Sequence, residues 1–228
     1  MNIDTNSIVT ATEANQNFSR VARLAEKRGK VVVFKNNRPK LLVIDLDTEP
    51  QIEMSEDEKL IIRNMEEMDG PVFVEGLTAQ GWHPDIAGFM SRLKDQSKGK
   101  CVALTAVYEG CPAGYVYVYL HADDGPFKEK GWPIIVDFNV LKKFQRKGIG
   151  NRLMDAAEQV AAQYADTVCL GVGVCGSYGT AQRMYVRRGY IPDGSGVWYQ
   201  GKQCVQYETV CTVDDDLILF FSKELRGD

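Results

Sequence analysis

The sequence predicts an α/β (α+β) protein with a small N-terminal unit and a larger C-terminal one. Residues 134–140 form an apolar, β-prone run, and a basic, glycine-containing turn then leads into a helix near Ile149. Residues 101–108 and 113–121 have the pattern of two antiparallel strands joined by a short turn. The first fifty residues hold a helix and a hairpin of their own, which predicts a separate unit.

Composition limits the class of protein. A chain of 228 residues makes one large or two small domains. Hydrophobic residues make up 44% and charged residues 25%, which is typical of a packed, soluble protein. No apolar run comes near the roughly 20 residues needed to cross a bilayer, and the N-terminus lacks the layout of a signal peptide. We expect a cytoplasmic protein that is not bound to a membrane.

The cysteines and histidines argue against several kinds of site. The six cysteines are scattered without a Cys-x-x-Cys pair, which disfavours zinc and a disulfide framework and favours free thiols. His83 and His121 are the only histidines and lie far apart in the sequence. We therefore expect no metal site and no histidine-based catalytic triad.

The larger unit has a definite order of expected elements. Its strands are expected at residues 59–63, 101–108, 113–121, 132–140, 167–174 and 217–221. Its helices are expected near residues 69–80, 85–96, 149–164 and 178–188. The apolar face of the third helix is expected to consist of Ile149, Leu153, Ala156, Val160 and Tyr164. The alternating Tyr115, Tyr117 and Tyr119 are interpreted as packing residues, with an aromatic wall beside an amine pocket as the alternative.

Residues 145–150 have the local architecture of a phosphate-binding turn. The first N–H groups of a helix have no acceptor within the helix, and together with the helix dipole they favour an anion. Arg146 and Lys147 add positive charge there. Leu153 stands where a dinucleotide-binding fingerprint needs its third glycine, and no Gly-Lys-Ser/Thr follows. The turn alone fits equally well a helix start that contains glycine and exposes its basic residues to solvent, without any bound phosphate.

A second motif downstream removes that tie. Ala181, Tyr185, Gly189 and Tyr190 follow the pattern Ala-x-x-x-Tyr-x-x-x-Gly-Tyr. In this order and separation, the motif and the turn at residues 145–150 closely resemble the GNAT (Gcn5-related) N-acetyltransferase superfamily. The resemblance covers about residues 56–224. It implies a mixed, mostly antiparallel sheet that is splayed at the acetyl-CoA site, with acetyl-CoA as cosubstrate and a primary amine as acceptor.

The resemblance also implies roles for individual residues. The strand backbone at Phe138, Asn139 and Val140 would pair with the pantetheine arm of acetyl-CoA. Its pyrophosphate would be held by the turn that consists of Gln145, Arg146, Lys147, Gly148, Ile149 and Gly150. Tyr185 matches the family's general acid, because a phenol with a pKa of about 10 stays protonated at neutral pH. The alternative role for this tyrosine is that of a core aromatic.

The general base is less well defined. Asp137, on the strand beside the cofactor, is the best carboxylate candidate, although an exposed or structurally bonded aspartate fits the pattern equally well. Glu75 and Asp85 are weaker candidates, and a water chain is another. Tyr178 stands where many relatives have an asparagine that touches the cofactor, which puts that contact in doubt. Cys175 lacks the nearby histidine that a covalent route needs.

The acceptor would be selected by two variable segments, residues 69–100 and the loop at residues 194–216. The loop contributes Trp198, Tyr199, Tyr207 and the acidic run 214–216. Acidic groups near the mouth favour a cationic amine, although such a run is usually a solvated turn. A tRNA acceptor would favour a basic surface, whereas residues 51–228 carry a net charge of −6. We therefore expect a small amine or a peptide.

The N-terminal unit carries a net charge of +2. Residues 7–10 are β-prone, Thr12 is the expected N-cap and Gly29 the expected helix stop. A hairpin is expected from the β-prone runs 30–35 and 40–45 around a turn at residues 36–39. The apolar helix face is expected to consist of Ala14, Phe18, Val21, Ala22 and Ala25.

The stretch from Ile8 to Ser19 and this hairpin resemble the Phd/YefM antitoxins over about residues 3–48, which implies a dimerising DNA-binding domain. Asn15 stands where the family often has arginine. Acidic residues 47–58 look like a linker in place of the family's toxin-neutralising tail, so we expect domains at residues 1–50 and 51–228. The candidates for DNA-phosphate contact are Arg20, Arg23, Lys27, Lys35 and Arg38, with a solvated helix face as the alternative.

The sequence thus predicts an acetyl-CoA-dependent N-acetyltransferase that carries an antitoxin-like module for operator DNA. The alternative is a transcriptional regulator that uses the acetyltransferase fold as an acetyl-CoA sensor. A third hypothesis is a toxin–antitoxin fusion that acetylates aminoacyl-tRNA. A homodimer is expected, because one helix on a small sheet buries too little apolar surface to be robust alone.

Overall fold

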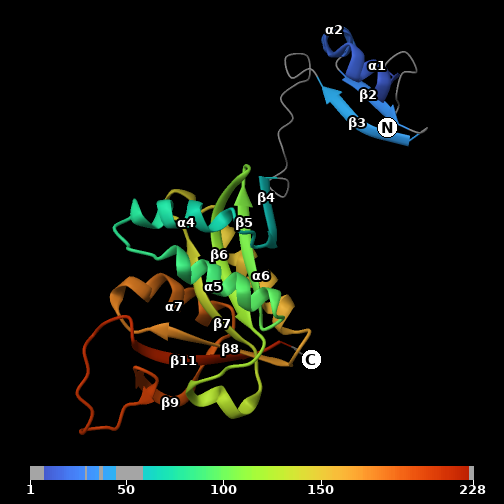
Figure 1. The fold of residues 1–228 in the computed structure, drawn as a ribbon. Coiled ribbons are helices and arrows are strands. Elements are labelled where there is room, and N and C mark those ends of the chain that lie inside the picture. Colours follow the sequence, from blue (N-terminus) through green and yellow to red (C-terminus); the bar gives the residue numbers. More distant parts are fainter. Residues whose placement is uncertain (1–7, 29, 36–37, 45–58, 226–228) are drawn as a thin grey trace. The chain divides into compact units, whose positions relative to one another are not determined.

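The computed structural model describes residues 8–28, 30–35, 38–44 and 59–225 (Figure 1). The chain divides into two compact units, Met1–Ser55 and Glu56–Asp228. The expected linker at residues 47–58, the helix stop Gly29 and the turn residues 36–37 lie outside the described residues. Each unit is described by itself.

The N-terminal unit is a three-stranded sheet with two helices. Its elements are β1 (Ile8–Thr10), α1 (Ala11–Gln16), α2 (Phe18–Arg28), β2 (Lys30–Lys35) and β3 (Arg38–Ile44). The strand order is β1-β2-β3, in which β1 runs parallel to β2 and β2 pairs antiparallel with β3. The expected hairpin is therefore present. The small core consists of Val9, Val21, Ala25, Val31 and Val33.

The helix of this unit differs from the prediction in two ways. The cap is Thr10 rather than Thr12: the hydroxyl of Thr10 accepts from the Glu13 amide at 3.2 Å, and the Glu13 carboxylate accepts from the Thr10 amide at 2.9 Å. This capping box satisfies two N–H groups at once. The helix is also broken at Asn17, whose φ of −151° and ψ of 74° are not helical. Because the break changes the phase of the face, Phe18 is 65% exposed instead of buried.

The larger unit is built on an eight-stranded sheet in the order β10-β9-β11-β8-β7-β6-β5-β4. Every pairing in it is antiparallel except that of β7 with β8, which is parallel. This confirms the prediction of a mixed, mostly antiparallel sheet. The strands are β4 (Leu60–Asn64), β5 (Cys101–Tyr108), β6 (Cys111–Tyr119), β7 (Ile134–Val140), β8 (Thr167–Gly173), β9 (Ile191–Tyr199), β10 (Lys202–Gln203) and β11 (Leu217–Glu224).

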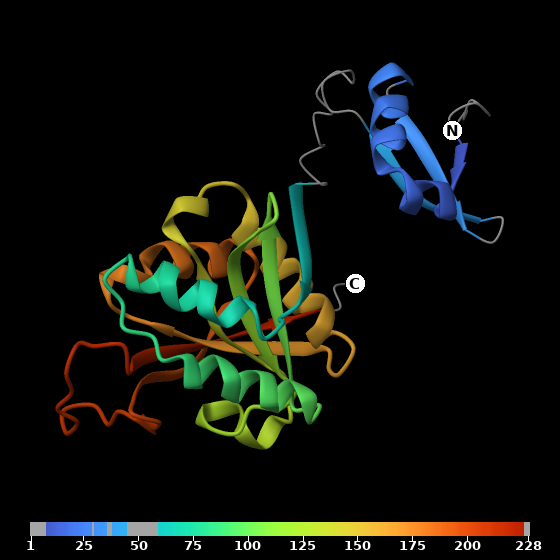
Figure 2. The same cartoon turned by 45° about the horizontal axis from the view of Figure 1, so that its top comes forward.

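Helices cover both faces of this sheet (Figures 1 and 2). Alternation along β5 and β6 explains the two layers, because successive side chains point to opposite faces. Ala103, Tyr115 and Tyr117 pack with α4 and α5, whereas Leu104 and Val116 pack with α6 and α7. The tyrosines of β6 are thus packing residues. The helices are α4 (Asp69–Thr78), α5 (Ile86–Ser97), α6 (Ile149–Ala161) and α7 (Gly179–Arg187), with short 3₁₀ turns at η2 (Gly125–Lys130), η3 (Lys142–Phe144) and η4 (Gly176–Tyr178).

Two expectations about the second half of the chain are wrong. Helix α6 ends at Ala161, so Tyr164 lies beyond it and is 52% exposed. Strand β9 continues to Tyr199 and forms a hairpin with β10, so the loop expected from residue 194 starts ten residues later and leaves Trp198 in the sheet. Glycines led to a loop prediction for a segment that the neighbouring strand β11 holds extended. The buried side chains of α6 are Ile149, Leu153, Met154, Ala157 and Ala161.

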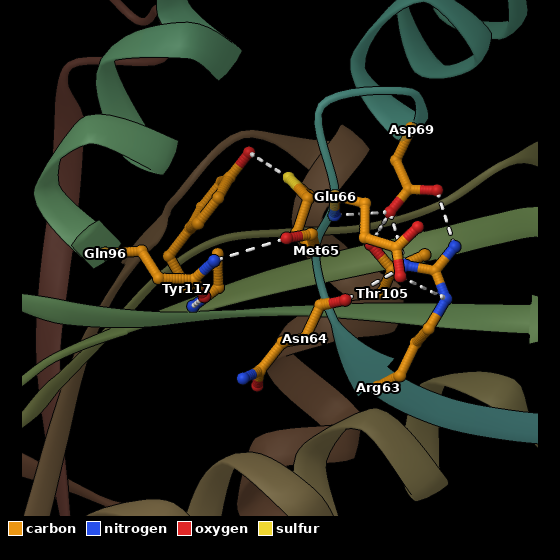
Figure 3. Close-up of polar contacts among 9 residues, drawn as sticks. Arg63, Asn64, Met65, Glu66, Asp69, Gln96, Thr105 and Tyr117 are labelled. Atoms are coloured by element: carbon orange, nitrogen blue, oxygen red, sulfur yellow. Dashed lines mark hydrogen bonds and ion pairs between the residues drawn. The ribbon is translucent and has the colours of Figure 1, made fainter.

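A buried carboxylate fixes α4 to the sheet (Figure 3). Asp69 is 1% exposed and accepts two hydrogen bonds from the Arg63 guanidinium, at 2.7 and 2.8 Å. The Glu66 amide and the Thr105 hydroxyl also donate to it, at 2.9 and 3.0 Å. Burial raises the pKa of Asp69, but the hydrogen bonds from Arg63, Glu66 and Thr105 outweigh burial and hold the pKa below its ordinary value. No local pattern in the sequence predicts this buried role for Asp69.

Candidate active site

The sheet opens between its two parallel strands. Strands β7 and β8 pair at Ile134 with Cys169 and at Ile135 with Leu170, and the pairing ends there although both strands continue. Two side chains cap the far ends of the opening. The Gln145 amide donates to the Val140 carbonyl at 3.0 Å, and the Gln182 amide donates to the Gly173 carbonyl at 2.7 Å. Between them, the two inner strand edges form a wedge that we call the β7–β8 wedge.

A β-bulge in β7 shapes one wall of this wedge. Tyr115 pairs with Asn139 and Tyr117 pairs with Val136, so Asp137 and Phe138 together oppose one residue of β6. Asp137 has a φ of +51°, a left-handed conformation that is uncommon outside glycine. Bulges of this kind turn side chains to new directions. Here the bulge leaves Phe138 facing α6 and α7.

The predicted phosphate turn joins β7 to α6. Gly148 has a φ of +76° and is the N-cap of α6, with no side-chain cap, and Arg146 has a φ of +62°. The first N–H groups of α6 therefore remain available to an anion. Arg146 and Lys147 are exposed beside them. A Cβ atom on Gly150 would lie 3.2 Å from the ring of Phe138, so glycine allows the ring to pack directly on the helix start.

Tyr185, on α7, packs against the β7 side of the wedge. Its side chain is 6% exposed, and its ring contacts Phe138 and Tyr190 edge to face, with centroid distances of 6.4 and 5.8 Å. Burial raises the pKa of the Tyr185 phenol, with a further contribution from Tyr178. The phenol is therefore protonated throughout the neutral range and is suited to donating a proton.

Asp137, the expected base, is held in an ion pair. The Arg92 guanidinium donates to its carboxylate at 2.7 Å, and the Asp137 side chain is 49% exposed. Arg92 comes from α5 and also donates to the Tyr119 hydroxyl at 2.8 Å, which in turn donates to Asp95 at 2.7 Å. The guanidinium lies over the rings of Tyr117 and Tyr119. Arg92 was missed in the sequence because it is 45 residues from Asp137 and belongs to no motif.

The other two carboxylates proposed as bases lie elsewhere. Glu75 is exposed on α4. Asp85 is the N-cap of α5, where its carboxylate accepts from the Ala87 amide at 2.9 Å. Among the contacts that the structure describes, none joins either residue to Tyr185 or Asp137.

The acidic segment before β11 docks at the end of β8. The Tyr178 hydroxyl donates to Asp215 at 3.0 Å, and the Tyr199 hydroxyl donates to Asp214 at 3.1 Å. The Cys175 thiol donates to the Asp214 carbonyl at 3.2 Å. Burial, followed by the contact with Asp215, raises the pKa of Tyr178 to about 12. Two of the three aspartates in the run are therefore hydrogen-bonded to the body of the unit rather than merely solvated.

The candidates for DNA contact lie on the surface of the N-terminal unit. Arg20, Arg23 and Lys27 are exposed on α2, and Lys35 is exposed at the end of β2. Arg38 pairs with Lys35 at the start of β3, and its side chain lies outside the described residues. The Arg23 guanidinium donates to the Ser19 carbonyl at 3.2 Å, so one of its N–H groups is used within its own helix.

Two further properties concern the described part of the chain. It contains no group of three or more His, Cys, Asp or Glu side chains placed to hold a metal ion. None of its helices has both the length and the apolar character needed to span a membrane.

Comparison with known proteins identifies the class. The model of the acetyltransferase (GNAT) family matches residues 63–190, more than half of the chain. The chain therefore belongs to this family, whose enzymes take an acetyl group from acetyl-CoA. The structural features fit this cosubstrate, because the β7–β8 wedge leaves strand edges free and the glycine-lined start of α6 leaves amides free beside it. No curated protein matches the chain.

Several solved structures share the fold. Ard1 from Thermoplasma volcanium has a TM-score of 0.55 at 16% identity, over 74% of this chain and 99% of that chain. The yncA acetyltransferase from Salmonella typhimurium, solved with acetyl-CoA, has a TM-score of 0.55 at 13% identity, over 75% and 96%. The ribosomal-protein-S18-alanine N-acetyltransferase from Escherichia coli has a TM-score of 0.54 at 14% identity, over 74% and 96%. At these identities the likeness establishes the fold alone.

Proposed function

We propose that the larger unit transfers the acetyl group of acetyl-CoA to a primary amine by direct attack. The observation that carries this proposal is the β7–β8 wedge, with the open amides of α6 at one end and the buried phenol of Tyr185 packed beside Phe138. A phosphate site, a free strand edge and a proton donor are the three elements that acyl transfer from this cosubstrate needs.

Each part of the wedge has a task in this proposal. The amides of the turn from Gln145 to Gly150 bind the pyrophosphate, with Arg146 and Lys147 adding charge. The β7 backbone from Phe138 to Val140 binds and orients the pantetheine arm, which supplies the activated acetyl group when bound. Tyr185 donates its proton to the sulfur that leaves the thioester. Burial raises the pKa of Tyr185, so its phenol stays protonated at neutral pH before the transfer.

Asp137 has a different task from the one suggested by its position on the strand. One of its oxygens accepts from Arg92, so we propose that Asp137 binds and orients the incoming ammonium group, which then loses its proton to water. Asp214 and Asp215 contribute negative charge at the end of β8. A cationic acceptor is favoured by these carboxylates. We propose a small amine or a peptide amine, and two of the similar structures are named as ribosomal-protein alanine N-acetyltransferases.

A direct assay tests this function. The full-length protein is incubated with labelled acetyl-CoA and a panel of polyamines, amino acids and peptides, and the release of coenzyme A is measured. Acetylation of a cationic amine is the expected result. The proposal fails if the protein neither binds nor consumes acetyl-CoA, and its acceptor part fails if only neutral or anionic acceptors react.

For the N-terminal unit we propose binding to operator DNA as a dimer, in a cytoplasmic protein. The support is the exposed row of Arg20, Arg23 and Lys27 on α2, with Lys35 at the end of β2. Phosphate contacts of this kind make affinity strongly dependent on salt. A gel-shift experiment with promoter DNA should therefore show binding by the full chain that weakens with salt and is lost in the Arg20→Ala/Arg23→Ala/Lys27→Ala variant.

The same experiment addresses the second candidate function, a transcriptional regulator that senses acetyl-CoA. DNA affinity that changes with acetyl-CoA, in a protein with no transferase activity, would support the regulator over the enzyme. A toxin–antitoxin fusion remains the third hypothesis. It would require acetylation of aminoacyl-tRNA, which the net charge of −6 over residues 51–228 disfavours.

A further inference from the structure

Two cysteines lie at the ends of a tight turn that follows β10. The Val205 amide donates to the Thr209 hydroxyl at 2.8 Å, and the Thr209 amide donates to the Val205 carbonyl at 3.0 Å. The Cys204 amide donates to the Val197 carbonyl at 2.8 Å, which fixes the start of the turn to β9. The turn reverses the chain and returns it beside its own start. Figure 2 shows the segment in red, extending beyond the sheet.

The turn brings the thiols of Cys204 and Cys211 together. Both are free cysteines: Cys204 is half-buried and Cys211 is exposed, and the side chain of Cys211 is close enough to Cys204 to act on its thiol. Partial burial and then the neighbouring Cys211 raise the pKa of Cys204. The other internal thiols have different partners, since Cys101, Cys169 and Cys175 each donate to a backbone carbonyl.

We propose that Cys204 and Cys211 are a redox modification site, at which a reversible disulfide closes residues 204–211 into a ring. In a reducing compartment the pair is a dithiol, and a disulfide there is transient and of the kind used to sense oxidation. The contact between the thiols and the turn that enforces it both favour this pair, because a disulfide needs two cysteines held at close range.

The chemistry balances with a low-molecular-weight disulfide, such as glutathione disulfide, as oxidant. The exposed thiol of Cys211 loses its proton and attacks one sulfur of that disulfide, which releases one small thiol and leaves a mixed disulfide on Cys211. The Cys204 thiol then loses its proton and attacks the Cys211 sulfur, which releases the second small thiol. Two protein thiols are oxidised, and one small disulfide is reduced to two thiols.

The position of the ring gives the modification a consequence. The chain that leaves Cys211 runs on to Asp214 and Asp215, which hold the hydroxyls of Tyr199 and Tyr178. Ring closure reduces the number of conformations that this segment can adopt when it is undocked. The disulfide therefore favours the docked state of the segment. This consequence rests on the proposed function. In that function, the docked segment lies at the acceptor side of the wedge and restricts the entry of the amine.

The disulfide is tested first without any assay of activity. The full-length protein is treated with excess glutathione disulfide, alkylated and mapped by mass spectrometry under non-reducing conditions. The peptide with Cys204 and Cys211 should lose two hydrogens and carry no glutathione. Cys204→Ser should instead retain glutathione on Cys211, because no second thiol resolves it. Cys111→Ser is the matched control, since Cys111 is also exposed but lies at the start of β6, and it should behave as the wild type.

The inference is wrong if wild-type Cys211 keeps glutathione, if neither thiol reacts, or if Cys111→Ser abolishes the loss of hydrogens. A second measurement tests the docking. Hydrogen exchange at residues 212–216 should be at least about threefold slower in the oxidised than in the reduced protein, and unchanged in Cys211→Ser. Equal exchange in both states overturns the docking consequence. Neither measurement uses acetyl-CoA or an amine, so a failure of the transferase proposal is seen separately.

Discussion

The ring of Phe138 meets the ring of Tyr185 edge to face, with their centroids 6.4 Å apart. Phe138 comes from the bulged end of β7 and Tyr185 from the middle of α7, so this contact joins α7 to the β7 side of the β7–β8 wedge. Gly150 completes the arrangement, because its missing Cβ leaves room for the Phe138 ring. Tyr185, the end of β7 and the start of α6 are therefore packed as one unit.

Replacement of Tyr185 by phenylalanine tests the proton donor. The Tyr185→Phe variant keeps the ring and its packing but loses the hydroxyl, so kcat should fall by about 100-fold or more. The dissociation constant for acetyl-CoA should stay within about twofold of the wild-type value, because the hydroxyl is proposed to act on the departing sulfur and not in binding the cosubstrate. Steady-state kinetics and calorimetric titration give both values. An unchanged kcat would show that another group protonates the sulfur.

The pH dependence of the wild type gives a related prediction. Because burial raises the pKa of Tyr185, its phenol stays protonated beyond the ordinary value of a tyrosine. The rate should therefore show no loss on the basic side up to about pH 10, the ordinary value for a tyrosine. A pH–rate profile of kcat checks this. A basic limb below about pH 9 that is absent in Tyr185→Phe would show that the pKa of this tyrosine is not raised.

Two glycine variants separate the phosphate turn from general helix stability. A Cβ at position 150 presses on the Phe138 ring at 3.2 Å, so Gly150→Ala should raise the KM for acetyl-CoA several-fold. Gly88→Ala is the control, because a Cβ at position 88 meets no atom within 4 Å in α5. The control should stabilise the protein by about 0.5–1 kcal/mol and leave this KM unchanged. Equal KM values for both variants would argue against the proposed position of the pyrophosphate.

The ion pair of Asp137 and Arg92 predicts an effect on the acceptor alone. Asp137→Asn should raise the KM for the amine by about tenfold, the loss expected for one hydrogen bond to a charged group. Its unfolding free energy should change by less than about 1 kcal/mol, because the pair is partly exposed. Asp85→Asn is a matched control, since asparagine caps a helix as well as aspartate. A larger effect on kcat than on the KM of Asp137→Asn would restore the role of general base.

The buried Asp69 predicts how stability depends on pH. Its pKa is lowered in the folded state, so its contribution is present above the unfolded value of about 3.9 and is lost as pH falls through the folded pKa. Asp69→Ala should cost about 3 kcal/mol or more at neutral pH, because it removes the acceptor of the buried Thr105 hydroxyl and the nearer of the two carboxylates that pair with Arg63. Denaturant unfolding between pH 7 and pH 3 measures both. The variant should show a weaker acid dependence than the wild type, and an equal slope would refute this.

Local patterns in the sequence were enough to predict the elements that build the wedge. The β-prone run before Gly148, the helix after it and the Tyr185 motif all lie within short segments whose periodicity or spacing is visible directly. The mixed, mostly antiparallel character of the sheet follows from the family resemblance. The pattern leaves the use of each group open, because a tyrosine that packs in the core and one that donates a proton look identical in a sequence. The structure shows that Tyr185 is a core aromatic, and its role as proton donor stays a prediction.

Contacts between distant segments could not be predicted in this way. Arg92 reaches Asp137 from α5, and Arg63 reaches the buried Asp69 beside Thr105, and no local spacing signals either pair. The break at Asn17 depends on the Asn17 side chain, whose oxygen accepts from the Arg20 amide at 3.1 Å and so starts a second helix. The extension of β9 through two glycines depends on its partner β11, whose pairing overrides a weak local preference.

The unpaired edges inside the sheet have a consequence beyond catalysis. The hydrogen bonds between β7 and β8 stop before the strands end, so a ligand in the gap can complete the pairing. Any ligand that binds only the native protein shifts the unfolding equilibrium toward the native state. The coenzyme is then a stabiliser of the polypeptide as well as a reactant. The cellular lifetime of the protein should lengthen when nutrients are plentiful and shorten in starvation, when proteases meet more of the empty form.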